Sequence, residues 1–535
     1  MRLNGIFKNN MVFQRDAEIR VFGYTNVVGE TNMIKARIKS GRKVLSKDAT
    51  YEIYDDGFFL CILPALPAGG PYSLEVVSEA EGPESKIVIK NIYIGEVWIA
   101  GGQSNMEYPL GRSENASSVV PNCPETNIHF YRVPAADLYD DALIRGEDES
   151  HWDVINSKTC YDMSGVAFYF ARKVEDYLKE HKGEGEEDLH FGIIGCYLGG
   201  TSVSSWQSVD ALKKTSAGKM YLDEFNEACF KWENEDEYLT AEENFADAAT
   251  AYVNKISEAL KTNPYLNYVE ADKIVGPGPW PPPVGPLSVR RPGALFDCMV
   301  LRIVPFSVRG VIFYQGEEDA EDHSTDYAEV FKSMIEDWRA VFWDDDMPFL
   351  FCQLPRFTTR EAQNQNMDDY NWPRLRDQQQ IVADEMPNVH MAVLIDCGEF
   401  DNVHPINKKI PGERLADLAL KFIYGFEEVP AVSPFLSDIR RGYGIEAVFD
   451  GDFERLEIKS KHASDDTGFE LAGEDGVFQR ADATVDFDGK TVHVASKFVP
   501  EPQYIRYGYF SYGHARLKSD TGLPAAPFDI RIDLE

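Results

Sequence analysis

The segment Glu96–Met106, EVWIAGGQSNM, joins a nearly continuous apolar run to a Gly-Gly turn and a serine placed where a helix is expected to begin. Apolar runs without alternation are typical of strands buried on both faces of a parallel sheet. Four further runs of this kind follow along the chain: Phe191–Gly195 (FGIIG), Val311–Tyr314 (VIFY), Phe349–Cys352 (FLFC) and Met391–Ile395 (MAVLI).

Helical patterns separate these five runs. Ser164 is a candidate N-cap for a helix in which Val166, Phe170 and Val174 recur at three-to-four spacing, and Tyr327–Phe342 and Leu375–Glu385 have similar patterns. Alternation of strand and helix predicts a doubly wound α/β domain. We expect it to span residues 93–425, with a five-stranded parallel sheet.

Short strands are expected on both sides of this domain. Residues 1–92 and 426–535 carry β-branched and aromatic runs between Gly, Asp and Pro turns, which predicts two β-sandwich-like regions. Inside the α/β domain, residues 208–275 are acidic and helix-prone and are interpreted as an insertion. The segment Gly276–Pro286 holds six prolines and predicts a stiff loop, either a plain surface loop or a wall of a pocket.

Composition excludes several classes of function. The 535 residues include 53 Lys plus Arg and 89 Asp plus Glu, a net charge of −36, which disfavours nucleic-acid and membrane partners. No apolar stretch is long enough to span a bilayer, and the N-terminus lacks a signal-type apolar region, so we expect a cytoplasmic protein unless a leader was removed. The eight cysteines form no CxxC pair and no disulfide framework, and five of them lie in apolar surroundings that predict small core residues: Cys61, Cys196, Cys298, Cys352 and Cys397.

Ligands of parallel α/β sheets bind beyond the carboxyl ends of the strands. Ser104 follows the first strand, where it is either a helix cap or a nucleophile beside free backbone N–H groups. After the second strand, Gly200 is either part of a plain turn or a backbone oxyanion donor. Gln315 and Glu317 follow the third strand.

The last strand is followed by Asp401 and His404. This spacing lets the carboxylate orient an imidazole whose other nitrogen faces a nucleophile, and Pro405 holds the backbone of His404 extended. The usual GxSxG elbow, Walker, GxGxxG, HExxH and CxxC motifs are absent, so neither a metal nor another cofactor is expected.

Four blocks, GQSNM (Gly102–Met106), IGCYLGGTSVSSW (Ile194–Trp206), RGVIFYQGEED (Arg309–Asp319) and DNVHP (Asp401–Pro405), together resemble the sialate O-acetylesterase-like branch of the SGNH hydrolases. Their order and spacing match, and flanking segments extend the resemblance over essentially the whole chain. It implies a flavodoxin-like fold and serine-dependent hydrolysis of acetyl esters on sugars.

Carried over residue by residue, the resemblance makes Ser104 the nucleophile, His404 the base and Asp401 its partner. Ser104 and Gly200 would supply oxyanion N–H groups. The third block lacks the superfamily's usual Asn, and Gln315 is the candidate for the missing amide donor. In the closer family this block is QGESN, so Glu318 and Asp319 also depart from the pattern. Because carboxylates near an oxyanion would weaken it, we expect both to point outward.

The predicted substrate is an acetylated sugar or oligosaccharide. Candidate binding residues are Gln103, Asn105, Glu317, Trp280 and Arg290. A sialic acid would need an arginine for its carboxylate, and Arg290 and its neighbour Arg291 are either candidates for this contact or a salt-bridged surface pair. A neutral acetylated xylo- or hemicellulose oligosaccharide fits equally well. A non-catalytic carbohydrate-binding protein and a metal-dependent hydrolase are the alternatives from other classes.

Overall fold

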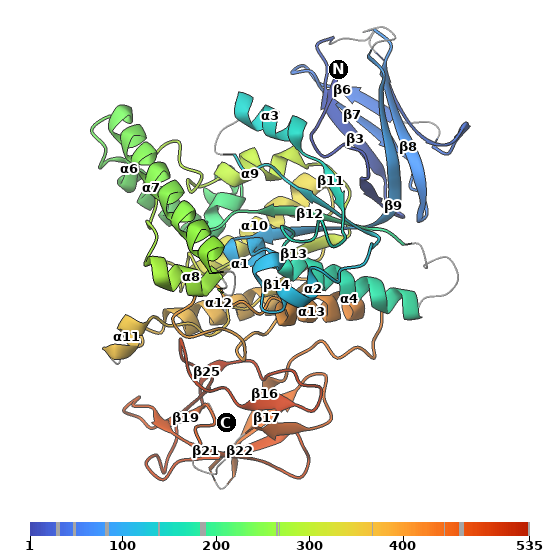
Figure 1. Cartoon of the computed structure of the whole chain (residues 1–535). Coiled ribbons are helices and arrows are strands. Elements are labelled where there is room, and N and C mark those ends of the chain that lie inside the picture. Colours follow the sequence, from blue (N-terminus) through green and yellow to red (C-terminus); the bar gives the residue numbers. More distant parts are fainter. Residues whose placement is uncertain are drawn as a thin grey trace.

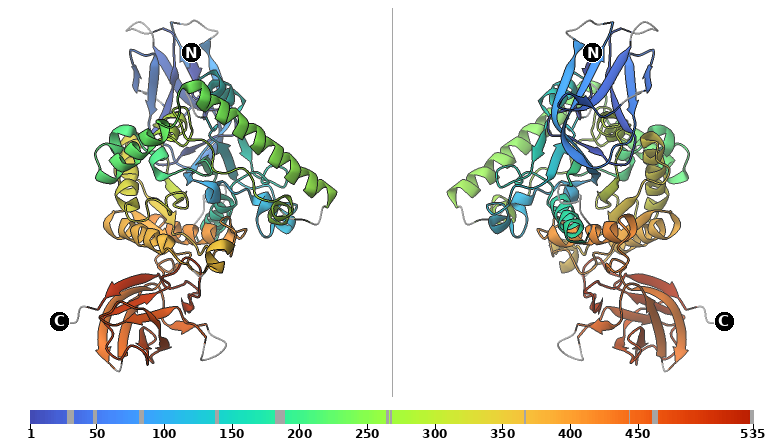
Figure 2. Two further views of the ribbon diagram at one scale, coloured as in Figure 1. Left: turned by 90° about the vertical axis from the view of Figure 1, so that its left-hand side faces the viewer. Right: turned by 90° about the vertical axis from the view of Figure 1, so that its right-hand side faces the viewer.

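A computed structural model describes residues 1–27, 33–46, 50–80, 85–136, 140–181, 189–263, 266, 268–365, 367–442, 444–459 and 465–532. Three regions are arranged along the long axis of the molecule (Figures 1 and 2). A β-rich N-terminal region lies at one end, an α/β region in the middle and a β-rich C-terminal region at the other end.

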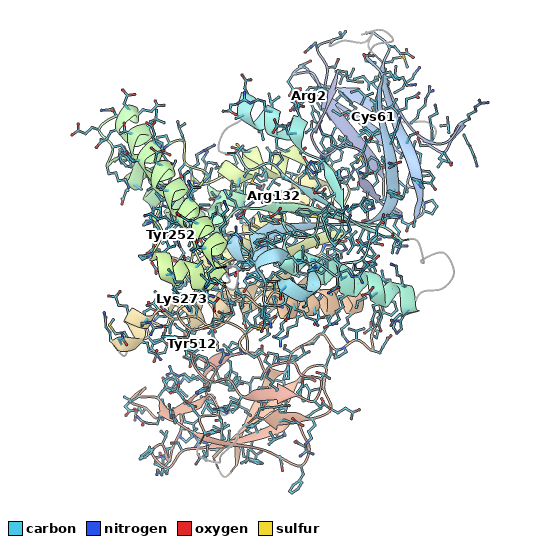
Figure 3. The ribbon with its side chains drawn as sticks, viewed as in Figure 1. Arg2, Cys61, Arg132, Tyr252, Lys273 and Tyr512 are labelled. Atoms are coloured by element: carbon cyan, nitrogen blue, oxygen red, sulfur yellow. The ribbon has the colours of Figure 1, made fainter. Side chains whose placement is uncertain are left out.

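The N-terminal region contains two small sheets. Strands β1, β3, β7 and β6 form one antiparallel sheet, and β8 pairs antiparallel with β4 on one side and with the start of β9 on the other. Alternate side chains fill the space between the sheets, and Cys61 lies buried there (Figure 3). The strands are β1 (Arg2–Leu3), β2 (Val12–Gln14), β3 (Ile19–Tyr24), β4 (Ile34–Ser40), β5 (Lys43–Val44), β6 (Thr50–Ile53), β7 (Phe58–Leu63), β8 (Gly69–Ser78) and β9 (Ile87–Gly102).

Strand β9 links the N-terminal and central regions. Its first half pairs with β8, and its second half, Glu96–Gly102, lies in the middle of the central sheet. The expected boundary after residue 92 therefore falls inside one continuous strand, and the division into domains stays a prediction.

The central sheet has the strand order β11-β10-β12-β9-β13-β14-β15. All five predicted apolar runs contribute strands, and these pair in parallel. The expected number of five parallel strands was too low, because β10 adds a sixth and β11 an antiparallel edge strand. Besides β9, the strands of the central sheet are β10 (Ile128–Arg132), β11 (Trp152–Val154), β12 (Phe191–Tyr197), β13 (Gly310–Tyr314), β14 (Phe349–Cys352) and β15 (Val389–Ala392).

Both faces of this sheet are buried under helices. Successive side chains of a strand point to opposite faces. In β9, Val97 and Ile99 pack into the core shared with α10 and α12, whereas Trp98 and Ala100 pack into the core shared with α4 and α13. This two-sided burial explains why the strand sequence is apolar without alternation. The covering helices are α4 (Gly165–His181), α9 (Ala294–Cys298), α10 (Tyr327–Phe342), α12 (Asn371–Glu385) and α13 (Lys409–Leu418).

Helix starts follow the expected chemistry. The Ser164 hydroxyl accepts a hydrogen bond from the amide of Ala167 at 3.1 Å, so the predicted cap of α4 is confirmed. Shorter helical segments connect the main elements: α1 (Ser104–Glu107), η2 (Leu110–Arg112), α2 (Ala116–Val119), α3 (Asp141–Glu149), η3 (Val203–Trp206), η4 (Val300–Arg302), α11 (Arg360–Asn364) and η5 (Ala419–Ile423).

The predicted insertion is helical. It comprises α5 (Val209–Leu212), α6 (Ser216–Cys229), α7 (Glu235–Thr262) and α8 (Tyr268–Val275), drawn in green in Figure 1. Helix α7 buries few of its side chains, Tyr238 and Ile256 among those described, in keeping with its acidic sequence. The proline-rich segment 276–286 contains neither helix nor strand, as predicted.

The C-terminal region consists of antiparallel sheets packed around its own apolar core. The four-stranded sheets β16-β17-β22-β21 and β20-β19-β23-β25 face this core together with the β18-β24 pair. The strands are β16 (Phe435–Gly442), β17 (Gly444–Asp450), β18 (Leu456–Ile458), β19 (Phe469–Ala472), β20 (Gln479–Arg480), β21 (Asp482–Val485), β22 (Thr491–Ala495), β23 (Tyr504–Tyr507), β24 (Leu517–Ser519) and β25 (Phe528–Arg531).

Two sequence expectations concern the whole chain. All eight cysteines are free thiols, six of them buried. In the described parts of the chain, every helix is too short or too polar to cross a lipid bilayer. The cellular location stays a prediction.

Candidate active site

Three loops begin side by side at the carboxyl edge of the central sheet. The last residues of β12 and β13, Tyr197 and Tyr314, both pair with Gly102, the last residue of β9. The residues that follow these strands are therefore brought together, as the sequence analysis assumed.

Ser104 is positioned by a glycine turn at the end of β9. Gly102 has a φ of +124°, and an added Cβ would lie 2.2 Å from the carbonyl oxygen of Tyr314, so only glycine fits. The turn makes Ser104 the first residue of α1, where backbone N–H groups have no acceptor within the helix. The Ser104 Oγ lies 2.9 Å from Nε2 of His404, 300 residues further along the chain. Their predicted meeting is confirmed, and their catalytic roles stay predictions.

The loop that carries His404 is braced by its neighbours. The Asn402 side chain accepts a hydrogen bond from the His404 amide at 3.1 Å and donates to the His404 carbonyl at 3.0 Å. Asn402 also donates to Glu399, whose other carboxylate oxygen accepts the amide of Ile406. Burial, and then the positive charge of Lys408, lower the pKa of His404 to about 4. A neutral imidazole at pH 7 is able to accept the Ser104 proton.

The structure does not bring Asp401 to His404, which corrects the predicted orienting contact. Asp401 has a φ of +58°, and its carboxylate accepts hydrogen bonds from the Arg360 amide at 2.9 Å and Nε at 3.1 Å. These bonds, the backbone one first, lower the pKa of Asp401. Among the described residues, no carboxylate forms an ion pair with the His404 ring. The arrangement is therefore a serine–histidine pair whose histidine is held by its own loop.

The loop after β12 passes directly beside the serine. A Cβ added to Gly199 would lie 3.2 Å from the Ser104 Cβ, and the Gly199 amide donates to the Glu107 carboxylate at 2.8 Å. Glu107 in turn pairs with Arg132, labelled in Figure 3. This loop conformation brings Gly200, with a φ of +67°, to the rim of the site.

Gln315 is not available as an oxyanion donor, contrary to the prediction. Its side chain is buried, and its amide nitrogen donates to Gln103 and to the Thr201 carbonyl, both at 3.1 Å, and to Asp319. Its carbonyl oxygen accepts the Tyr327 hydroxyl at 2.7 Å. Gln315 therefore ties the loops after the first three strands together from beneath the site.

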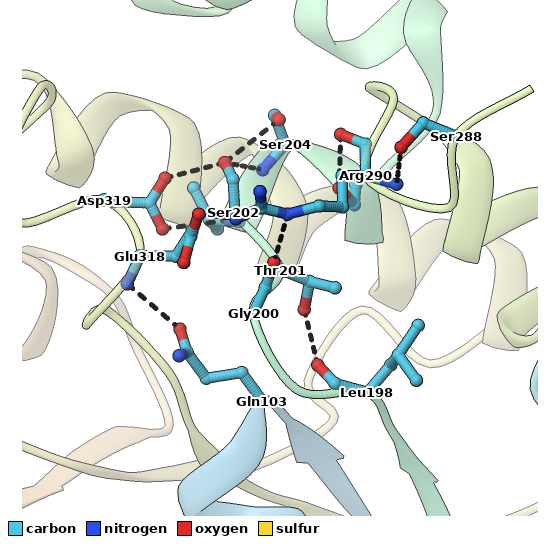
Figure 4. A network of polar contacts seen from close by, with 12 residues as sticks. Gln103, Leu198, Gly200, Thr201, Ser202, Ser204, Ser288, Arg290, Glu318 and Asp319 are labelled. Atoms are coloured by element: carbon cyan, nitrogen blue, oxygen red, sulfur yellow. Dashed lines mark hydrogen bonds and ion pairs between the residues drawn. The ribbon is translucent and has the colours of Figure 1, made fainter. Parts of the chain in front are cut away.

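The two unusual carboxylates of the third block do not point outward, and this expectation was wrong. Asp319 is fully buried and accepts hydrogen bonds from the Ser202 hydroxyl at 2.7 Å, the Val203 amide at 3.1 Å and the Tyr221 hydroxyl at 2.9 Å. Glu318 forms an ion pair with Arg290 (Figure 4). The charge of Glu318 is thus balanced by Arg290, whereas Asp319 is held by uncharged hydrogen-bond donors.

Asn105 and Glu317 form a buried polar cluster with Lys408. The Asn105 amide donates to Glu317 and to the Val403 carbonyl, and its oxygen accepts from the Lys408 ammonium. Burial lowers the pKa of Lys408 to about 7 and raises the pKa of Glu317. The cluster joins Asn105, which follows Ser104, to Val403, which precedes His404. Asn105 and Glu317 therefore support the serine–histidine pair instead of lining a binding surface.

The remaining predicted binding residues differ in exposure. Gln103 is buried, and its side-chain oxygen accepts the Glu318 amide at 3.3 Å. Trp280 is 61% exposed, and its ring is so near Gly200 that a Cβ there would lie 2.2 Å from the ring. The Arg290 guanidinium lies 4.9 Å from the centre of the same ring. Trp280 is thus the most exposed of the predicted binding residues, and through its ring the proline-rich loop lies against Gly200 and Arg290. Whether this loop is a wall of the site stays a prediction.

Sequence reasoning missed several residues that shape the site: Glu107, Arg360, Glu399, Asn402 and Lys408. Lysine is rarely buried, so nothing in the sequence pattern marked Lys408 apart from its position four residues after His404. As for metals, no group of three or more His, Cys, Asp or Glu side chains suited to a metal ion occurs within the described residues.

Comparison with known proteins adds to this geometry. Residues 287–421 match the family model described as "Carbohydrate esterase, sialic acid-specific acetylesterase". The chain is 22% identical to sialate O-acetylesterase of Mus musculus over 81% of its length and 75% of that protein, and 20% identical to the Homo sapiens enzyme over 81% and 73%. A crystal structure of a carbohydrate acetylesterase from Xanthomonas citri superposes with a TM-score of 0.71 at 24% identity, covering 99% of each chain.

The chain thus combines an α/β sheet that carries a serine–histidine pair at its carboxyl edge with similarity to carbohydrate esterases. The predicted resemblance to the sialate O-acetylesterase-like family is confirmed by the family model and the sequence relatives. The Xanthomonas structure shares the fold over the entire chain, including both β-rich ends.

Proposed function

We propose that this protein is a serine-dependent carbohydrate O-acetylesterase of the SGNH type, which removes acetyl groups from sialic acid or related sugars. The observation that carries the proposal is the 2.9 Å contact between the Ser104 hydroxyl and the imidazole of His404. A hydroxyl needs an adjacent neutral base to attack an ester carbonyl at neutral pH, and His404 is such a base.

The first half-reaction forms an acetyl-enzyme. Ser104 Oγ attacks the acetyl carbonyl carbon while its proton passes to Nε2 of His404, and the carbonyl oxygen becomes an oxyanion. The backbone N–H groups of Ser104 and Gly200 are the proposed donors to this oxyanion. The bond between the acetyl carbon and the sugar oxygen then breaks, and His404 gives its proton to that oxygen.

Water completes the cycle. His404 takes a proton from a water molecule, the hydroxide attacks the acetyl-Ser104 carbonyl, and acetate leaves as Ser104 recovers its proton. The Asn105–Glu317–Lys408 cluster keeps the two residues in register, and the Lys408 charge disfavours the protonated form of His404. The exposed ring of Trp280 is the proposed stacking surface for the sugar.

A second candidate substrate is a neutral acetylated hemicellulose oligosaccharide. The pairing of Arg290 with Glu318 favours it, because the predicted partner for a sialic acid carboxylate already has a carboxylate beside it.

The test is acetate release from acetylated sialosides, acetylated xylo-oligosaccharides and 4-nitrophenyl acetate, with Ser104→Ala as the matched control. The proposal expects release from at least one sugar, loss of that activity in Ser104→Ala, and full activity after treatment with a chelator. Hydrolysis that persists in Ser104→Ala would contradict it. Chelator-sensitive activity would favour a metal-dependent hydrolase, and sugar binding without any acetate release would favour a carbohydrate-binding protein.

A further inference from the structure

Arg290 is a positively charged side chain beside the loop that follows β12 (Figure 4). Its Nε donates a hydrogen bond of 2.6 Å to the Gly200 carbonyl, and its guanidinium covers one face of Trp280. Gly200 adjoins Gly199, whose backbone passes beside Ser104. Arg290 is therefore placed where an arginine would meet a charged group on a sugar bound over Trp280.

Glu318 occupies that guanidinium. It forms an ion pair with Arg290, and its backbone amide is anchored to the Gln103 side chain next to the nucleophile. The side chain of Arg290 is 11% exposed and that of Glu318 is 27% exposed, so the carboxylate is the more accessible member of the pair. A ligand that approaches the rim meets the negative group before the positive one.

A second negative charge lies behind the pair. Asp319 is fully buried beside Ser202 and Val203, and its charge acts on the Arg290 guanidinium. One guanidinium is thus flanked by two carboxylates, which leaves this part of the rim with a net negative charge. The whole chain, at −36, adds to that field.

We infer that the Glu318–Arg290 pair is a charge filter, which makes the site selective for acetyl esters on neutral sugars over those on sugars bearing a carboxylate. This inference rests on the proposed esterase function and decides between its two candidate substrate classes: it favours the neutral acetylated oligosaccharide over sialic acid, which bears a carboxylate. In it, Trp280 and the Gly200 loop bind the uncharged face of the sugar ring, and Glu318 repels a carboxylate that would otherwise bind Arg290.

The test compares two substrates that differ only in the carboxylate: a methyl glucoside and a methyl glucuronide, each acetylated at the same hydroxyl. The readout is the ratio of kcat/KM for the neutral ester to kcat/KM for the anionic ester, which cancels any general loss of activity. Wild type should prefer the neutral ester. Glu318→Gln should lower the ratio on the order of tenfold, because it removes one unit charge close to the ligand and frees Arg290.

Glu321→Gln is the matched control, since it makes the same change of charge at an exposed position three residues along the same segment. Its ratio should equal that of wild type. If Glu318→Gln does not fold, the wild-type ratio is measured from low to high salt instead, and it should fall as screening weakens the repulsion.

A wild-type preference for the glucuronide, or a ratio that neither Glu318→Gln nor salt changes, would overturn the inference. Its failure is distinguishable from failure of the proposed function. If only the inference fails, Ser104-dependent hydrolysis remains but Glu318 does not make it favour the neutral ester. If the proposed function fails, neither ester nor 4-nitrophenyl acetate is hydrolysed in a Ser104-dependent manner.

Discussion

The activity of an Asp401→Asn variant distinguishes a catalytic triad from the serine–histidine pair seen in the structure. In a triad, the aspartate holds the histidine in the correct tautomer and stabilises its charged form, and an Asp→Asn change costs about 10⁴ in kcat. In this structure, the Asp401 carboxylate is bonded to Arg360. The change should therefore act only on the loop that both residues share.

The expected loss of activity is small because the ion pair between Asp401 and Arg360 is partly exposed to solvent. The Arg360 side chain is 66% exposed and that of Asp401 is 32% exposed, and ion pairs of this kind contribute about 0.2–1 kcal/mol. If all of that energy were lost from positioning His404, kcat/KM would fall by up to about fivefold. The two accounts thus differ by more than three orders of magnitude.

The assay is steady-state hydrolysis of an acetylated sugar by wild type, Asp401→Asn, Arg360→Gln and the double variant. Because both single changes break the same contact, the structure predicts similar small losses that are not additive. Thermal unfolding of each variant checks that the fold is retained.

A loss of about 10³ or more in kcat for Asp401→Asn, with Arg360→Gln close to wild type and all variants folded, would refute this reasoning. It would mean that Asp401 turns to His404 during catalysis and acts as the third member of a triad.

The remaining predictions concern the surroundings of the pair. Since His404 must be neutral to act as a base, kcat/KM should stay constant down to acid pH and fall only near pH 4. Lys408→Met removes a nearby positive charge and should raise the pKa of His404, so the acid limb of a pH–rate profile should move toward higher pH. Gln315→Ala should lower the free energy of unfolding by about 2–4 kcal/mol in a denaturant titration, because it leaves buried partners unpaired. An unchanged stability together with a loss of about 10²–10³ in kcat would instead support a role as an oxyanion donor. Gly200→Ala should lower kcat/KM on the order of tenfold or more, since a Cβ in this left-handed conformation meets Trp280, and full activity would show that the loop adapts freely.

Much of the fold follows from local pattern. The five apolar runs predicted parallel strands because each is buried on both faces. Strand β10 (Ile128–Arg132) was missed because its sequence, IHFYR, mixes polar and apolar residues at the edge of the parallel set. Its pairing with β12, which sequence pattern does not reveal, makes it a strand.

The candidate site divides in the same way. Ser104 and His404 were predictable because each follows a strand whose carboxyl end lies at the same sheet edge. The directions of Asp401 and Glu318 were not, since a side chain in an irregular loop follows its tertiary partner, and these partners, Arg360 at the start of α11 and Arg290, come from distant parts of the sequence. Burial of charged groups depends on such partners and leaves no trace in local sequence.

The central claim is that the Ser104 hydroxyl, activated by His404, is the nucleophile. The most direct measurement is labelling with a serine-reactive fluorophosphonate, followed by peptide mass spectrometry of wild type and His404→Ala. The account predicts one adduct per chain, on Ser104, that forms in parallel with loss of esterase activity and far more slowly in His404→Ala. An inactivated enzyme labelled at another residue, or full activity with Ser104 completely modified, would contradict it.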